Sequence, residues 1–159
     1  MSVVVSLKAV VEEMDVPSDE YHAYLNKNTG ELVTIGEEEV NIIESGDSIE
    51  NYPLWQQDAI RKTQQVLNSS EYLPLPSKFD INEYRIMERF CLSVEEEKLR
   101  DRLLQCIRGS GAFGRFKNAI HEFGIVDKWY KFRQEAFEVI AVEWLESNNT
   151  RYTLDNKVE

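Results

Sequence analysis

The stretch from Asp80 to Ser147 constrains the fold most, because helical periodicity runs through it almost without interruption. Apolar residues recur three or four positions apart in four successive runs, which glycines or polar turns separate. Asp80 with Glu83, and Ser93 with Glu96, resemble capping boxes and predict where the first two helices begin. The last run, "DKWYKFRQEAFEVIAVEWLES", is apolar over most of its circumference, which is typical of a central helix.

Strand signals are confined to the first half of the chain. "EYHAYLNKNTGELVTI" alternates polar and apolar residues on both sides of a short loop, and Gly30 suits the left-handed position of such a loop. We therefore predict a β-hairpin. "EYLPLPS" is extended, and Pro74 and Pro76 restrict it to an edge strand or a surface strap.

Two helices are also expected in this half. The first carries apolar residues at helical spacing from Leu7 to Met14, and the second begins at Pro53 and ends near Asn68. Trp55, Ala59, Ile60, Val66 and Leu67 are the expected inward residues of the second helix. The run "EEEVNIIES" is compatible with a short helix or with irregular chain.

These patterns predict an α+β fold: a mostly helical single domain over residues 1–147, with a small antiparallel β-hairpin or sheet and a C-terminal helical cluster. A chain of 159 residues has the size of one domain. The polar residues 148–159 are expected to fray. No apolar run approaches the ~20 residues of a membrane span, and "MSVVVSLKAV" lacks a secretory signal. We therefore expect a cytoplasmic protein with no membrane partner.

The formal charge of −11 is spread unevenly along the chain. Residues 1–50 carry two basic and twelve acidic side chains, whereas residues 108–133 carry six basic and two acidic ones. The acidic whole argues against non-specific binding to nucleic acids. The basic window still leaves room for one anionic ligand.

The run "GSGAFGRFK" matches the dinucleotide fingerprint through Gly109, Gly111 and Gly114. That fingerprint follows a buried strand, but the preceding "EEEKLRDRLLQCIR" has helical periodicity. A phosphate-binding loop would need lysine and a hydroxyl residue where Arg115 and Phe116 stand. We therefore predict a structural turn, with Gly109 ending one helix, Ser110 capping the next and Gly111 allowing the two to approach closely.

A binding surface is a second interpretation of the same region. The helix that begins near Ala112 offers free N–H groups to an anion, and cations lie near it. The candidate binding residues are Ser110, Arg115, Lys117, Asn118, Lys128, Lys131 and Arg133. The competing interpretation is that these cations pair with the acidic first half of the chain. A helix-turn-helix is disfavoured, because its recognition face would hold Gly114 and Glu122, so specific DNA is not an expected partner.

The ordered motifs of the chain resemble a known bacterial family. They are "GSGAFGRFKN" at 109–118, "WYKFR" at 129–133 and "EWL" at 143–145, with "MERF", the "EYLPLPS" strap and the "NTGELV" hairpin upstream. Together they resemble uncharacterised protein family 0158. Gly114 and Asn118 depart from the arginine and aspartate usual in that pattern. The resemblance implies a small bacterial cytoplasmic protein of mixed helix and strand, and it brings no activity.

Residues for catalysis are sparse. The two histidines, His22 and His121, belong to no metalloprotease motif, and Cys91 and Cys106 have no C-x-x-C spacing and are interpreted as buried thiols in a reducing compartment. We predict no catalytic residue, no metal site and no cofactor. The leading hypothesis is a non-catalytic binding or adaptor module that contacts a protein partner through the Ser110–Arg133 surface. A phosphate-bearing ligand or RNA near Ala112 is the alternative, and a small hydrolase is the third hypothesis.

Overall fold

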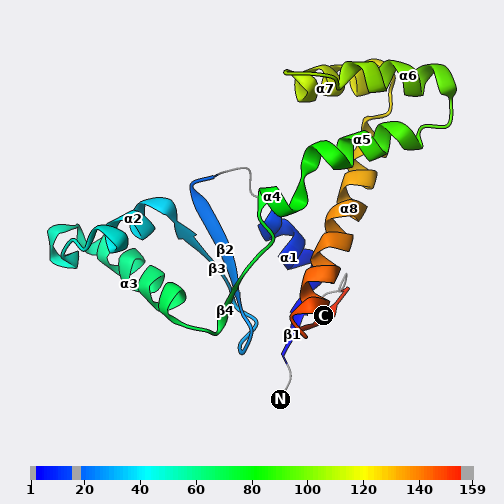
Figure 1. Ribbon diagram of the computed structural model, residues 1–159. Helices are drawn as coiled ribbons and strands as arrows, with labels where there is room; N and C mark the ends of the chain where they lie inside the picture. The colour runs from blue at the N-terminus through cyan, green and yellow to red at the C-terminus, as the bar shows by residue number, and fades with distance from the viewer. Residues whose placement is uncertain (1–2, 16–18, 155–159) are drawn as a thin grey trace. The chain divides into compact units, whose positions relative to one another are not determined.

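The computed structural model describes residues 3–15 and 19–154 and confirms an α+β fold (Figure 1). The chain divides into two compact units. Unit 1 comprises residues 1–77 and 141–159, and unit 2 comprises residues 78–140. The long helix α8 (Val126–Ser147) contributes to both units, since its residues from Ala141 onward belong to unit 1.

A three-stranded antiparallel sheet forms the centre of unit 1. Its order is β3-β2-β4, from β2 (Tyr21–Asn26), β3 (Leu32–Gly36) and β4 (Tyr72–Pro74). The predicted hairpin is confirmed, with Tyr24 opposite Val33 and Gly30 at a φ of +79°. The prolines of the "EYLPLPS" segment lie in or after β4, which is an edge strand as predicted.

Two helices pack with this sheet on one side (Figure 1). They are α2 (Glu37–Ser45) and α3 (Leu54–Asn68), and a 3-10 turn at Ile49–Asn51 precedes α3. The run "EEEVNIIES" is therefore a helix and not irregular chain. Val66 of α3 joins Val33, Ile35 and Tyr72 of the sheet in a small buried cluster. The predicted inward position of Trp55 is wrong, and so is that of Leu67, because the buried stripe of α3 runs through Gln56, Ile60, Thr63 and Val66.

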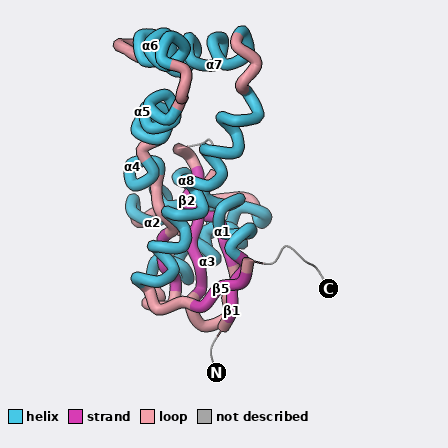
Figure 2. The backbone as a smooth tube through the Cα atoms, turned by 90° about the vertical axis from the view of Figure 1, so that its right-hand side faces the viewer, coloured by secondary structure: helices cyan, strands magenta, loops and turns pink. Residues whose placement is uncertain are grey.

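The remainder of unit 1 contains α1 (Leu7–Met14) and a second, parallel sheet. Leu7, Val10, Val11 and Met14 of α1 are buried, as their helical spacing predicts. The Ser6 side chain caps the helix by accepting from the Ala9 amide. β1 (Val4–Ser6) pairs in parallel with β5 (Arg151–Thr153) (Figure 2). Part of the segment expected to fray is therefore a strand, and residues 155–159 lie outside the described residues.

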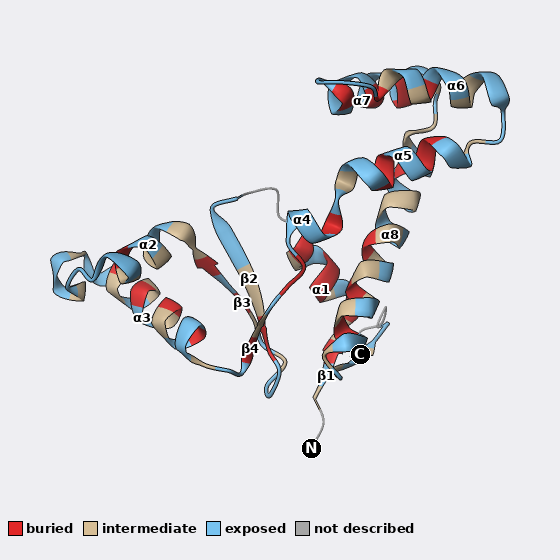
Figure 3. Ribbon diagram, viewed as in Figure 1, coloured by how far each residue is buried: buried red, intermediate tan, exposed pale blue. Residues whose placement is uncertain are grey.

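Unit 2 is helical and is centred on an aromatic cluster. Its helices are α4 (Lys78–Ile81), α5 (Glu83–Ser93), α6 (Glu97–Cys106), α7 (Ala112–Glu122) and the first part of α8. Phe90 of α5 makes edge-to-face contacts with Phe116, Trp129 and Phe132, at ring-centroid distances of 6.0, 5.4 and 5.5 Å. Figure 3 shows buried residues along the helices that supply these rings.

Both predicted capping boxes are wrong. α5 begins after Asn82, whose side chain accepts from the Arg85 amide at 3.2 Å, so Asp80 lies within α4. Ser93 is the last residue of α5, and its hydroxyl donates to the Phe90 carbonyl. α6 begins after Glu96, which makes no side-chain cap.

Candidate functional site

The turn between α6 and α7 is held by Arg115. Gly109 and Gly111 adopt φ angles of +77° and +80°, a region that strongly favours glycine. The Arg115 guanidinium donates to the carbonyls of Cys106 at 2.9 Å and Ser110 at 2.8 Å, and also to that of Arg108. Gly111 is the N-cap residue of α7, and no side chain caps the helix, so Ser110 does not fill the expected capping role. A helix, not a strand, precedes this turn.

Arg133 is also engaged within unit 2. Its Nε atom donates to Glu83 Oε2 at 2.7 Å, and its guanidinium lies 4.3 Å from the centroid of the buried Phe137 ring. The Arg133 side chain is mostly covered, which strengthens both contacts. Arg115 and Arg133 therefore bind parts of their own chain.

Four of the five other candidate residues, those on α7 and α8, are open to solvent. Lys117, Asn118, Lys128 and Lys131 are all exposed, and none of their side chains makes a hydrogen bond or ion pair with another residue in the described part of the chain. All seven predicted site residues thus belong to unit 2, but two of them hold its structure.

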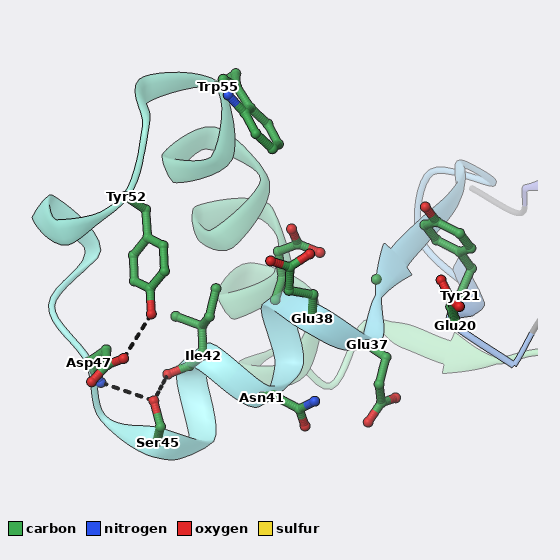
Figure 4. A pocket seen from close by; sticks show the side chains of 12 residues that line it. Glu20, Tyr21, Glu37, Glu38, Asn41, Ile42, Ser45, Asp47, Tyr52 and Trp55 are labelled. Atoms are coloured by element: carbon green, nitrogen blue, oxygen red, sulfur yellow. Dashed lines mark hydrogen bonds between the residues drawn. The ribbon is translucent and has the colours of Figure 1, made fainter.

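Unit 1 contains a cavity of about 610 Å³ that sequence reasoning missed (Figure 4). It is formed by the start of β2, the end of β3, helix α2 and the start of α3. Five carboxylates line it, and no lysine or arginine among the described residues does. The lining residues are Glu20, Tyr21, Gly36, Glu37, Glu38, Glu39, Asn41, Ile42, Ser45, Asp47, Tyr52 and Trp55.

Hydrogen bonds hold most of these carboxylates at separate places on the wall. Glu37 Oε1 lies 2.6 Å from His22 Nε2. Glu38 and Glu39 share the amide of the buried Gln56, which donates to them at 3.1 and 3.2 Å. Glu38 and Glu39 are therefore held together at Gln56, whereas Glu37 is held at a separate place by His22, and Asp47 lies beyond the end of α2.

The far end of this wall is a hydrogen-bonded turn. The Tyr52 hydroxyl donates to Asp47 Oδ2 at 2.8 Å, and the Asp47 amide donates to the Ser45 hydroxyl. The hydrogen bond to Asp47 raises the pKa of Tyr52, and desolvation and the charges of Asp47 and Glu38 raise it further. Tyr52 therefore stays a neutral donor that fixes the position of the Asp47 carboxylate.

Gly36 has a specific place in the cavity, because a Cβ there would lie 2.4 Å from Glu39 Oε1. A larger residue would displace the Glu39 carboxylate.

No local sequence motif indicates the cavity. Its acids come from Glu20, from the run 37–39 and from Asp47, and "EEE" is typical of a solvated helix start. Only the hairpin and the α2–α3 packing bring them together.

The described cysteine thiols are not paired. Burial raises the pKa of Cys91 to about 12, with a smaller contribution from Cys106. The Cys91 thiol is therefore protonated at neutral pH and is a poor nucleophile.

Within residues 3–15 and 19–154, no group of three or more His, Cys, Asp or Glu side chains could hold a metal ion. No helix in the same residues is long and apolar enough to cross a bilayer.

A family model matches residues 2–159 of the chain, and its description is "Uncharacterised protein family (UPF0158)". The match confirms the resemblance that the ordered motifs indicate. No curated protein and no solved structure gives a significant match.

Proposed function

The chain belongs to the uncharacterised protein family UPF0158, which assigns it no activity, and we propose from the cavity's geometry that it is a non-catalytic cytoplasmic binding module. Its ligand carries positive charge and occupies the acidic cavity of unit 1. The observation that carries the proposal is the lining itself: five carboxylates and no lysine or arginine among the described residues, around about 610 Å³.

Electrostatics supports a cationic ligand. Unit 1 holds eighteen acidic and six basic side chains, a net charge of −12, whereas unit 2 holds eleven and twelve, a net of +1. A concave wall of one charge sign concentrates ligands of the opposite sign and raises their association rate. The cavity is a hollow of unit 1 that such charge lines.

Isothermal titration with spermine, a small polycation, tests this proposal. We expect binding that weakens as sodium chloride rises, because exposed charges are screened over about 10 Å at 0.1 M salt. Glu38→Gln/Asp47→Asn removes two cavity charges but keeps oxygen acceptors for Gln56 and Tyr52. It should weaken binding about fivefold, since each exposed ion pair contributes about 0.2–1 kcal/mol.

Glu44→Gln/Glu50→Gln is the matched control, because it removes the same charge from exposed residues of unit 1 that do not line the cavity. Binding by this variant should stay within about twofold of the unmodified protein, as expected for screened surface charges. Equal losses in both variants would show only a general attraction to an acidic protein and would refute the proposed site.

The Ser110–Arg133 surface is a second candidate, as a docking site for a protein partner or for a phosphate-bearing ligand or RNA. It is favoured by Lys117, Lys128 and Lys131, which are exposed and make no ion pair within the described residues. Titration with inorganic phosphate and with a short single-stranded RNA, against Lys117→Ala/Lys131→Ala, distinguishes this candidate from the cavity. Arg115→Ala is unsuitable as a binding probe, because Arg115 holds the turn.

A further inference from the structure

Exposed apolar side chains adjoin the acidic cavity. Trp55 and Tyr21 line it and are 70% and 55% exposed. Leu54 precedes Trp55 at the start of α3 and is 79% exposed, although it does not line the cavity itself. Tryptophan and tyrosine are enriched at protein–protein interfaces and among the residues that dominate their binding energy. A small free cation would leave this apolar surface exposed to water.

The spread of the carboxylates sets the length of the ligand. Glu37 begins α2, and Asp47 lies just beyond the end of that helix at Ser45. A nine-residue helix is about 13 Å long, a span that about four residues of extended chain cover. Figure 4 shows Glu37, Glu38 and Asp47 placed along this wall and Trp55 at the start of α3.

We infer that the occupant of the cavity is an extended segment of a partner protein, with arginines about four residues apart and an apolar side chain between them. The inference rests on the proposed function and names its partner. Charge complementarity places the arginines on the α2 carboxylates. The indole of Trp55 offers a face on which a planar guanidinium stacks, and Leu54 and Trp55 cover the apolar side chain.

A set of short peptides tests this assignment by isothermal titration against the full chain. The first peptide carries two arginines four positions apart with leucines between them; a second replaces arginine with lysine, and a third replaces leucine with serine. We expect the first to bind at least about tenfold more tightly than spermine at equal salt, because it also buries apolar area. Each of the other two peptides should bind about threefold to tenfold more weakly than the first.

Trp55→Ala should weaken binding of the first peptide about tenfold and change spermine binding less than about twofold. Tyr130→Ala removes a similarly exposed ring from unit 2 and serves as the control. An unchanged urea midpoint for Trp55→Ala excludes loss of folding as the cause. If spermine binds but the peptide binds no more tightly, or Trp55→Ala leaves peptide binding intact, the inference is overturned and the proposed function survives. If neither probe binds, both fail.

Discussion

At the scale of single residues, Arg115 stabilises a place where the backbone lacks partners. The last carbonyls of a helix have no intrahelical donors and carry partial negative charge. The Arg115 guanidinium reaches back from α7 to the carbonyl of Cys106, the last residue of α6, and to those of Arg108 and Ser110 in the turn that follows. Arg115, which is a candidate binding residue by sequence, therefore joins α6 to α7.

Arg115→Ala should lower the free energy of unfolding by about 1–2 kcal/mol. A hydrogen bond from a charged group contributes about 1.5–3 kcal/mol, and solvent weakens the three that the exposed Arg115 makes. Urea denaturation followed by circular dichroism measures the change. Arg115→Lys should recover only part of it, since one ammonium cannot reproduce a planar guanidinium. Lys117→Ala, on the same helix, should change stability by less than about 0.5 kcal/mol. Equal stability of Arg115→Ala and Lys117→Ala would contradict the role of Arg115.

At the scale of elements, α5 begins where a left-handed asparagine and its side chain cooperate. Asn82 has a φ of +52°, and its side chain accepts from the Arg85 amide. Asn82→Ala should therefore cost about 1–2 kcal/mol, from backbone strain and the lost cap. Asn82→Gly relieves the strain and should cost less. Thermal unfolding measures both. Because both variants lose the cap, equal losses would show that backbone strain contributes nothing, and a larger loss for the glycine variant would contradict the role of the left-handed backbone.

Element types could be predicted from the sequence, but their ends and faces could not. Period 3.6 and the hairpin alternation identify α1, the β2–β3 pair and the helices of unit 2 correctly. The predicted start of α5 at Asp80 is wrong because Asp80 and Glu83 have the spacing of a capping box. The left-handed conformation of Asn82, after which the helix begins, cannot be recognised from the residue type alone. The helical spacing of apolar residues predicts Trp55 inside, yet the polar Gln56 takes the inward position, and its amide donates to Glu38 and Glu39.

The candidate site depended on contacts that no local pattern contains. The Ser110–Arg133 residues are adjacent in sequence and were therefore visible as a group. The cavity acids are separated in sequence and come together only when α2 and α3 pack beside the sheet. Likewise, the pairing of β1 with β5 joins the two ends of the chain, so the polar composition near Arg151 could not reveal a strand.

At the scale of the whole molecule, charge is divided between the two units: unit 1 carries a net −12 and unit 2 a net +1. Like charges within a compact unit repel one another and destabilise it. The ion pairs of Lys62 with Glu31 and of Arg61 with Asp58 are exposed. They offset little of this repulsion, so screening by salt should stabilise the fold.

We expect the melting temperature to rise by about 2–5 °C when sodium chloride increases from about 0.02 M to about 0.5 M, since the Debye length shortens severalfold over that range and 1 kcal/mol corresponds to about 2–4 °C for a chain of this size. Differential scanning calorimetry measures the shift, with chloride chosen because sulfate also strengthens apolar burial. Glu44→Gln/Glu50→Gln should raise the low-salt melting temperature and reduce the salt effect, because it removes two repelling charges from unit 1. Glu122→Gln, in the nearly neutral unit 2, should leave the salt effect unchanged. A melting temperature that falls with salt would mean that attractive ion pairs, and not the repulsion within unit 1, dominate the electrostatics of this protein.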